Sequence, residues 1–146
     1  MDSGNIGFVL LCAAFVFVMT PGLAMFYGGL VRKKNVVNTM MTSIFIIGVG
    51  IVMWVLFGYS LSFAPSGNAF IGDFRWLGLE GVSLTEGYTD GASIPNMVFS
   101  AFQMMFAVIT PALITGAVAG RMKFKSIFVF TIFWSLIVYY PLAHMV

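Results

Sequence analysis

The sequence predicts an all-α integral membrane protein with four transmembrane helices. Two observations lead to this fold class. First, 60% of the 146 residues are hydrophobic and only 8% are charged, whereas soluble domains carry roughly 25% charged residues. Second, the apolar residues form four runs, at 6–31, 36–63, 94–119 and 127–146, each reaching the roughly 20 residues that cross about 30 Å of hydrocarbon as a helix. We expect one domain, residues 1–146, with a long loop at 64–93.

The positions of the charged residues predict the orientation of these spans. Six of the seven basic residues lie in two short connections, around residues 32–34 and 121–125. Short loops rich in Lys and Arg remain in the cytoplasm, so we expect loops 32–35 and 120–126 to be cytoplasmic. The N-terminus, the loop at 64–93 and the C-terminus would then lie outside the cytoplasmic membrane. This topology accounts for the net charge of +2 without a nucleic-acid partner.

The first span contains an internal proline and several glycines. Pro21 has no backbone N–H, and membrane helices accept a proline where neighbouring protein compensates for the lost hydrogen bond. We therefore expect a kink at Pro21, packed against protein. Gly22, Gly28 and Gly29 remove side-chain bulk and would let another helix approach closely.

The second span and the loop after it are expected to meet at the outer membrane surface. Trp54 and Tyr59 approach the outer end of the span, where we expect an aromatic belt at the interface rather than a ligand site. Residues 64–93 are rich in Pro, Gly and acids, which predicts an irregular loop. Its large apolar residues suggest that the loop is partly packed down; they are Phe70, Phe74, Trp76, Leu77 and Leu79.

The third span carries polar atoms that a purely lipid-facing helix would not need. Gln103, Thr110 and Thr115 lie within AFQMMFAVITPALITGAVAGR, residues 101–121, in a region without water to solvate them. We interpret the helix as one wall of a permeation route for a small solute. Interhelical hydrogen bonding is the other expected use of Gln103 and Thr110.

Phenylalanines recur on the same span at helical spacing. Phe99, Phe102 and Phe106 follow one another at intervals of three and four, so we expect their rings to stack on one face of the helix. From spacing alone, two interpretations stay open. The stripe either packs against another helix, or it forms a gate and contacts a cation through the faces of its rings.

The sequence does not predict catalytic chemistry. No paired carboxylates lie in a span, and there is no Cys/His cluster and no glycine-rich loop between a strand and a helix. We therefore expect neither an enzyme nor a cofactor or metal site. His144, near the outer end of the aromatic fourth span, is expected to cap a helix end.

Four blocks of the sequence together resemble the ammonium transporter (Amt/Mep/Rh) family. They occur in the order and at the spacing of that family and extend over essentially the whole chain. The blocks are MTPGLAMFYGGLVRKKN at 19–35, WVLFGYSLSF at 54–63, FQMMFAVITPALITGAVAGRMKF at 102–124 and VYYPLAHMV at 138–146.

The resemblance implies a fold and two site residues. The family fold has eleven membrane helices with the N-terminus outside, and it assembles as a homotrimer in which each protomer has its own hydrophobic pore for ammonium or ammonia. By motif, Phe102 resembles an aromatic residue at the outer ammonium site. Phe106 resembles one of two stacked phenylalanines that bind the substrate and form the pore gate.

The resemblance also implies that this chain corresponds to the first four of the eleven helices. In the family, the tryptophan of the outer cation site follows the segment that ends here at Val146, and the pore histidines lie on later helices. We therefore expect an N-terminal fragment that does not transport alone and that needs the remaining helices of the same protein. The alternative is a membrane ammonium-sensing or assembly subunit without transport.

Overall fold

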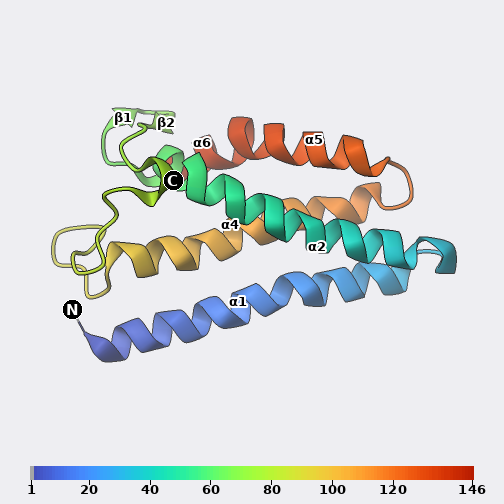
Figure 1. The fold of residues 1–146 in the computed structure, drawn as a ribbon, viewed down its shortest axis with the longest axis horizontal. Coiled ribbons are helices and arrows are strands. Elements are labelled where there is room, and N and C mark those ends of the chain that lie inside the picture. The colour runs from blue at the N-terminus through green and yellow to red at the C-terminus, as the bar shows by residue number, and fades with distance from the viewer. Residues whose placement is uncertain (1) are drawn as a thin grey trace.

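The computed structural model describes residues 2–146 and consists mainly of long helices lying side by side (Figure 1). Four helical segments are long and apolar enough to cross a membrane: Ser3–Leu30, Lys33–Phe63, Asn96–Val118 and Phe124–Met145. The prediction of an all-α membrane fold with four apolar helices is thereby confirmed. The helical elements are α1 (Ser3–Leu30), η1 (Lys33–Asn35), α2 (Val36–Met53), η2 (Trp54–Gly58), α3 (Tyr59–Phe63), η3 (Leu77–Leu79), α4 (Asn96–Val118), α5 (Phe124–Trp134), η4 (Ser135–Tyr139) and α6 (Tyr140–Met145).

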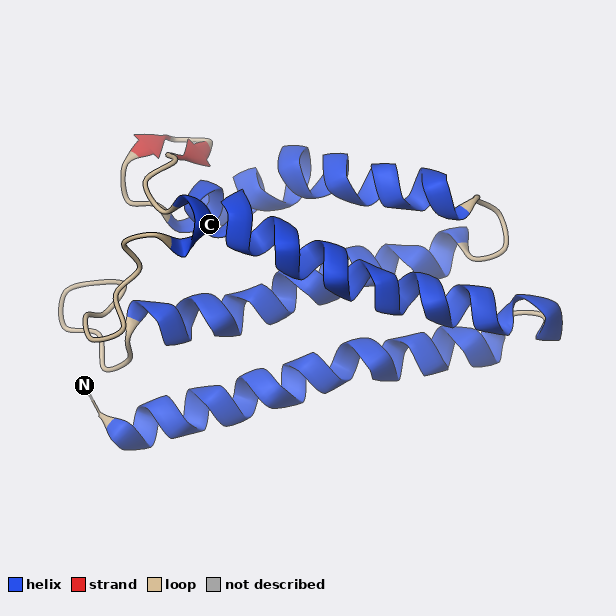
Figure 2. Cartoon of the chain, in the orientation of Figure 1, coloured by secondary structure: helices blue, strands red, loops and turns tan. Residues whose placement is uncertain are grey.

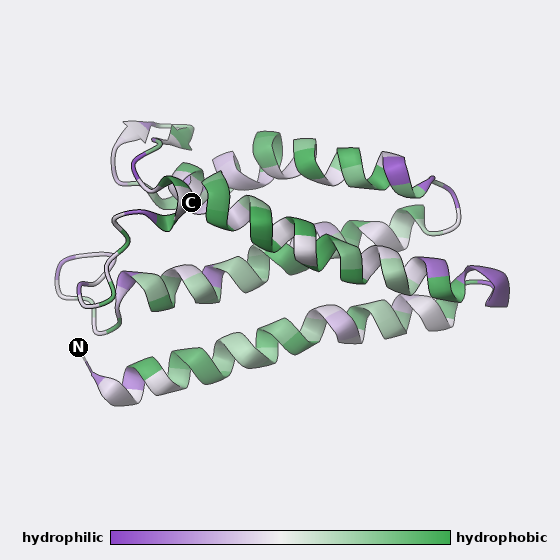
Figure 3. Ribbon diagram, in the orientation of Figure 1, coloured by the Kyte–Doolittle hydropathy of each residue, from purple (hydrophilic) through white to green (hydrophobic). Residues whose placement is uncertain are grey.

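Both chain ends and the long loop lie at one end of the helices, and the two short connections lie at the other (Figure 1). We call residues 64–95 the cap, and we call residues 31–35 together with 119–126 the basic end. Figure 3 shows apolar spans between these ends and hydrophilic residues in the connections. The cap holds the short antiparallel strands β1 (Gly67–Asn68) and β2 (Ile71–Gly72), seen in Figure 2. The loop is therefore less irregular than its composition predicts.

Helix α1 packs mainly against α2 and α4. It begins at the side chain of Asp2, which accepts a hydrogen bond from the Gly4 N–H at 2.9 Å, and it continues through Pro21 as a single helix. Gly28 allows close packing as expected, because a Cβ there would lie 2.9 Å from Cγ of Met40. Gly22 and Gly29 have no neighbour within 4 Å of such a Cβ, so no described helix uses the space that they leave.

The core near the cap is aromatic. Trp54, Tyr59 and Tyr140 are at most 2% exposed, so the expectation of an interfacial belt for Trp54 and Tyr59 is wrong. Both residues turn inward because α3 packs against α6 and the cap covers them. The Trp54 indole donates to Oγ of Ser100 at 3.3 Å.

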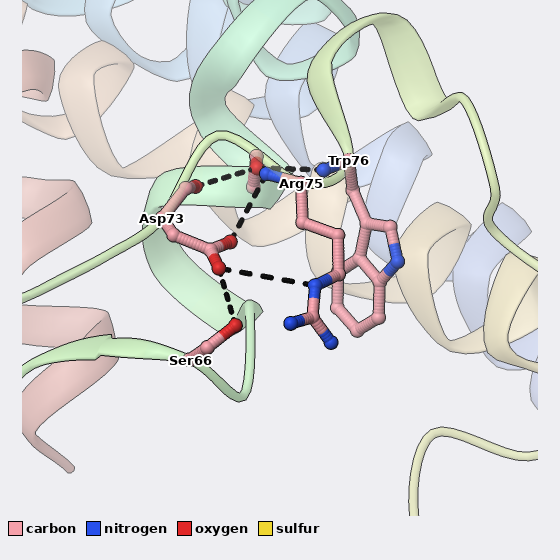
Figure 4. A network of polar contacts seen from close by, with 5 residues as sticks. Ser66, Asp73, Arg75 and Trp76 are labelled. Carbon is pink, nitrogen blue, oxygen red and sulfur yellow. Dashed lines mark hydrogen bonds and ion pairs between the residues drawn. The ribbon is translucent and has the colours of Figure 1, made fainter.

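Hydrogen bonds around the buried Ser60 hold the cap to α3. Figure 4 shows this polar network with Ser66, Asp73, Arg75 and Trp76 labelled. The hydroxyl of Ser60 donates to the Asp73 carbonyl at 2.7 Å and accepts from the Trp76 N–H at 3.0 Å. The Asp73 carboxylate accepts hydrogen bonds from the Ser66 hydroxyl and from the Arg75 N–H. These two donors hold the pKa of Asp73 below its usual value, with a smaller contribution from the charge of Arg75.

The cap is packed down only in part. Trp76 stacks on Tyr59 with ring centroids 5.3 Å apart, and Leu79 packs against the same core. Phe70 and Phe74 are instead 69% and 66% exposed. The expectation of a packed loop therefore holds for Trp76 and Leu79, and it is wrong for these two phenylalanines and for Leu77, which is 43% exposed.

Candidate functional site

Helix α4 has one face committed to the helix bundle. Its buried residues include Ala107, Val108, Ala112 and Thr115, and the helix packs against α1 and α2. Val108 lies against Gly50 of α2, where a Cβ would be 3.1 Å from the Val108 side chain. Small residues at this contact bring the helix backbones close together, and this packing fixes the rotation of α4.

The rings of Phe102 and Phe106 pair on a part of α4 that remains half-buried. Their centroids are 5.2 Å apart with an interplanar angle of 82°, an edge-to-face arrangement favoured by aromatic quadrupoles. Pairing leaves part of each ring accessible. The face of an aromatic ring is its negative pole, so an ammonium-sized cation within about 6 Å of a centroid would be attracted.

Phe99 does not extend this pair. Its ring stacks on Tyr88 of the cap, with centroids 4.8 Å apart at 11°, and meets Phe63 edge-on at 5.2 Å. The expected stripe of three rings is therefore divided. Phe99 belongs to the aromatic packing beneath the cap, whereas Phe102 and Phe106 form a separate pair further along α4.

The threonines of α4 are satisfied by their own helix. The Thr110 hydroxyl donates to the Phe106 carbonyl at 2.6 Å, and the Thr115 hydroxyl donates to the Ala112 carbonyl at 2.6 Å. The side chain of Thr110 also interacts with that of Tyr139 in η4, so a contact with another helix accompanies the bond within α4. Because the Phe106 carbonyl accepts this extra bond, Thr110 also ties the backbone of the phenylalanine pair. Gln103 is partly exposed on the same helix.

His144 lies in a separate location, between α3 and the β1–β2 hairpin. Its Nδ1 is 3.2 Å from the Ser62 carbonyl, and its Nε2 is 3.0 Å from the Asn68 carbonyl. Ser62 is in the last turn of α3, so the ring caps a helix end as expected. Among residues 2–146, no group of three or more metal-ligating side chains comes together.

Sequence comparison decides the family. The model of the Ammonium Transporter Family matches residues 7–146. The chain belongs to this family. It is 49% identical to an ammonium transporter of Bacillus subtilis (strain 168) over 147 aligned residues, which include all of this chain and 36% of that protein. It is 41% identical to a putative ammonium transporter of Methanothermobacter thermautotrophicus, again over all of this chain and 36% of the relative.

The fold agrees with solved structures of the family. The crystal structure of Saccharomyces cerevisiae Mep2 matches with a TM-score of 0.84 and 35% identity, over 98% of this chain and 34% of that one. The structure of Candida albicans Mep2 matches with a TM-score of 0.85 and 29% identity, over 99% and 31%. The chain thus spans about a third of the length of the relatives that it matches.

Several residues that position the pair were not predicted to be important. The Tyr59 hydroxyl hydrogen-bonds to the Asn96 side chain, and Ser100 accepts from the Trp54 indole. Asn96 and Ser100 therefore anchor the first turns of α4, just before Phe102, to the second span. Their spacing of four, which puts two polar residues on one helical face, was the available signal.

Proposed function

We propose that this chain forms one wall of an ammonium or ammonia pathway across the cytoplasmic membrane. The observation that carries the proposal is the half-buried Phe102–Phe106 pair in a chain that belongs to the Ammonium Transporter Family. In this proposal Phe102 contacts ammonium near the outer end, and Phe106 binds the substrate below it and forms part of the pore gate. The protein is a transporter and not an enzyme.

Ring faces suit this cargo for a physical reason. An aromatic face replaces part of the hydration shell of a small cation, with roughly 2 kcal/mol available from each desolvated contact. Carrying the bare charge further into hydrocarbon costs at least ~2.5 kcal/mol by the lowest of the insertion scales. Contact with the rings followed by loss of a proton would let the solute continue as ammonia.

The proposed orientation places the basic end in the cytoplasm and the cap outside. Arg32, Lys33 and Lys34 share the basic end with Arg121, Lys123 and Lys125, and short loops with this excess of positive charge stay inside. The acids lie at the other end: Asp73, Glu80, Glu86 and Asp90 are in the cap, and Asp2 precedes α1. We further propose that the assembled transporter is a homotrimer.

We also propose that residues 1–146 do not transport alone and act together with further helices of the same protein. Several apolar side chains of α1 are exposed, among them Phe8 (67%) and Met25 (66%), and Gly22 and Gly29 present open surface. The test is growth on low ammonium of a host lacking ammonium transporters. Residues 1–146 alone should give no rescue, and growth would refute this part of the proposal.

The role of Phe106 is tested in the longest reading frame that contains this chain. Phe106→Leu should reduce uptake of labelled methylammonium at least tenfold at equal membrane abundance, because leucine has no ring to offer. Phe70→Leu, at an exposed position of the cap, is the matched control and should keep uptake within twofold. Unchanged uptake by Phe106→Leu would show that Phe106 does not form part of a pore gate. Ammonium binding without uptake in the unmodified protein would favour a sensor or assembly subunit.

A further inference from the structure

The basic end concentrates positive charge that has no counter-charge nearby. All six of its basic side chains are exposed, and the acidic residues lie at the N-terminus and in the cap. Within residues 2–146 the ion pair that forms joins Arg75 to Asp73 at 3.8 Å, at the opposite end of the helices. Figure 3 shows the hydrophilic α1–α2 and α4–α5 connections together at the basic end.

Three of these side chains line a single hollow between the two connections. The hollow has a volume of about 500 Å³ and is lined by Arg32, Lys34 and Arg121 together with Asn35. The connections meet at its base, because a Cβ at Gly120 would lie 3.2 Å from Nδ2 of Asn35. The chain thereby brings together positive charges that are almost 90 residues apart in sequence.

The backbone around the hollow is fixed by tight turns. The Asn35 N–H donates to the Arg32 carbonyl at 2.8 Å, and the Arg121 N–H donates to the Val118 carbonyl at 2.9 Å. Gly120 has φ of +72°, a conformation that glycine adopts without steric cost. Fixed turns hold the starting points of the cationic side chains, so less ordering is needed when an anion binds.

We propose that this hollow binds the phosphate group of an anionic membrane lipid. Basic pockets between membrane helices recognise lipid headgroups in this way, and guanidinium groups match phosphate oxygens bidentately. A lipid fits better than a soluble anion because Leu30 and Val31 line the same hollow, and Leu30 is 70% exposed. The headgroup would meet the charges while its glycerol and upper chain lie along this apolar edge.

The chain offers a matched pair of variants for the test. The hollow variant combines Arg32→Gln, Lys34→Gln and Arg121→Gln. The control variant combines Lys33→Gln, Lys123→Gln and Lys125→Gln, which removes the same charge from the same end without touching the hollow. All six side chains are exposed, so both variants should fold, as monodisperse elution and unchanged circular dichroism would verify.

Binding is measured in detergent with phosphatidylglycerol carrying a fluorescent acyl chain. We expect unlabelled phosphatidylglycerol to compete and phosphatidylcholine not to compete. The hollow variant should lose at least tenfold in affinity, and the control variant less than threefold. This inference does not rest on ammonium transport, which the binding measurement leaves untested.

Three results would overturn the proposal. Equal losses in both variants would mean a diffuse surface charge instead of a site. Unchanged affinity in the hollow variant would place the lipid elsewhere. Displacement of the lipid by millimolar inorganic phosphate, but not by chloride at equal ionic strength, would identify the occupant as a soluble phosphate.

Discussion

Two serines on α3 allow one prediction to be worked out in detail. Ser60 and Ser62 are 0% and 1% exposed. The Ser60 hydroxyl makes two hydrogen bonds, to the Asp73 carbonyl and from the Trp76 N–H, whereas the Ser62 hydroxyl is buried with no hydrogen-bond partner among the described residues. Substitution by alanine therefore removes one buried hydroxyl from α3 in either variant, but only Ser60→Ala loses hydrogen bonds.

The expected magnitude follows from the number of hydrogen bonds. Ser60→Ala removes two, each with a net value of roughly 1 kcal/mol, so the cap should lose about 2 kcal/mol of local stability. Ser62→Ala removes a buried hydroxyl that makes no hydrogen bond, so we expect the stability of the cap to stay the same or to increase slightly. A loss of about 2 kcal/mol corresponds to roughly a 30-fold change in an opening equilibrium.

Amide hydrogen exchange of the cap, measured by mass spectrometry in detergent, reads this equilibrium directly. In Ser60→Ala, peptides containing Trp76 should exchange roughly 30-fold faster than in the wild type, while the middle of α4 stays protected. Ser62→Ala should exchange like the wild type. Equal acceleration by the two variants, or faster exchange in Ser62→Ala, would show that the Ser60 bonds do not hold the cap.

Two further predictions concern packing and pH. Gly58→Ala would place a Cβ 2.7 Å from Oη of Tyr140 and should destabilise the protein by roughly 1–3 kcal/mol. The measurement is the thermal unfolding midpoint, which should fall. The control is Gly48→Ala, whose Cβ would have no neighbour within 4 Å and which should leave the midpoint unchanged or higher. Hydrogen bonds to the ionised carboxylate of Asp73, chiefly from the hydroxyl of Ser66, lower its native pKa. This carboxylate therefore stabilises the folded protein above the ordinary pKa of about 3.9, and the stabilisation is lost as pH falls from there through the lowered native pKa. Asp73→Asn should therefore lower the midpoint at pH 6 and make less difference at pH 3; an equal difference at both values would contradict the assignment.

Composition and the positions of the charges predicted the fold class because both depend directly on whether a segment lies in lipid or in water. Long apolar runs have no stable alternative to helices in hydrocarbon, and the basic clusters at Arg32–Lys34 and Arg121–Lys125 divided the connections into two sets. The structure places the two chain ends and the cap together at one end and both basic connections at the other (Figure 1). That arrangement matches the alternation of the charges along the sequence.

The direction in which an aromatic side chain points was much harder to predict. Trp54 and Tyr59 have the composition and position of an interfacial belt, yet both are buried, because their partners Ser100 and Asn96 come from a helix about 40 residues away. Phe99 and Phe102 have the same residue type and nearly the same helical face, yet the ring of Phe99 packs against Tyr88 of the cap and Phe63, whereas that of Phe102 pairs with Phe106. Such contacts depend on the three-dimensional path of the cap.

The proposed roles of Phe102 and Phe106 came from family motifs, since spacing alone left both core packing and cation contact open. The structure adds the edge-to-face pair and the half-buried position. Periodicity cannot supply either fact, because it gives the side of the helix on which a ring starts and not what lies beside it.

The turns η2 and η4 give the cap-side portions of two spans a helical phase of their own. Each is a π-helical turn, in which the Tyr59 N–H donates to the Trp54 carbonyl and the Tyr140 N–H to the Ser135 carbonyl. A turn that holds about one extra residue rotates every later side chain by about 100° relative to an uninterrupted α-helix. Each turn thus has the effect of one residue inserted into an α-helix, and the packing of Tyr59 and Tyr140 in one core holds it in place. Shortening either turn by one residue would rotate Tyr59 or Tyr140 away from their shared core without changing the side chains available.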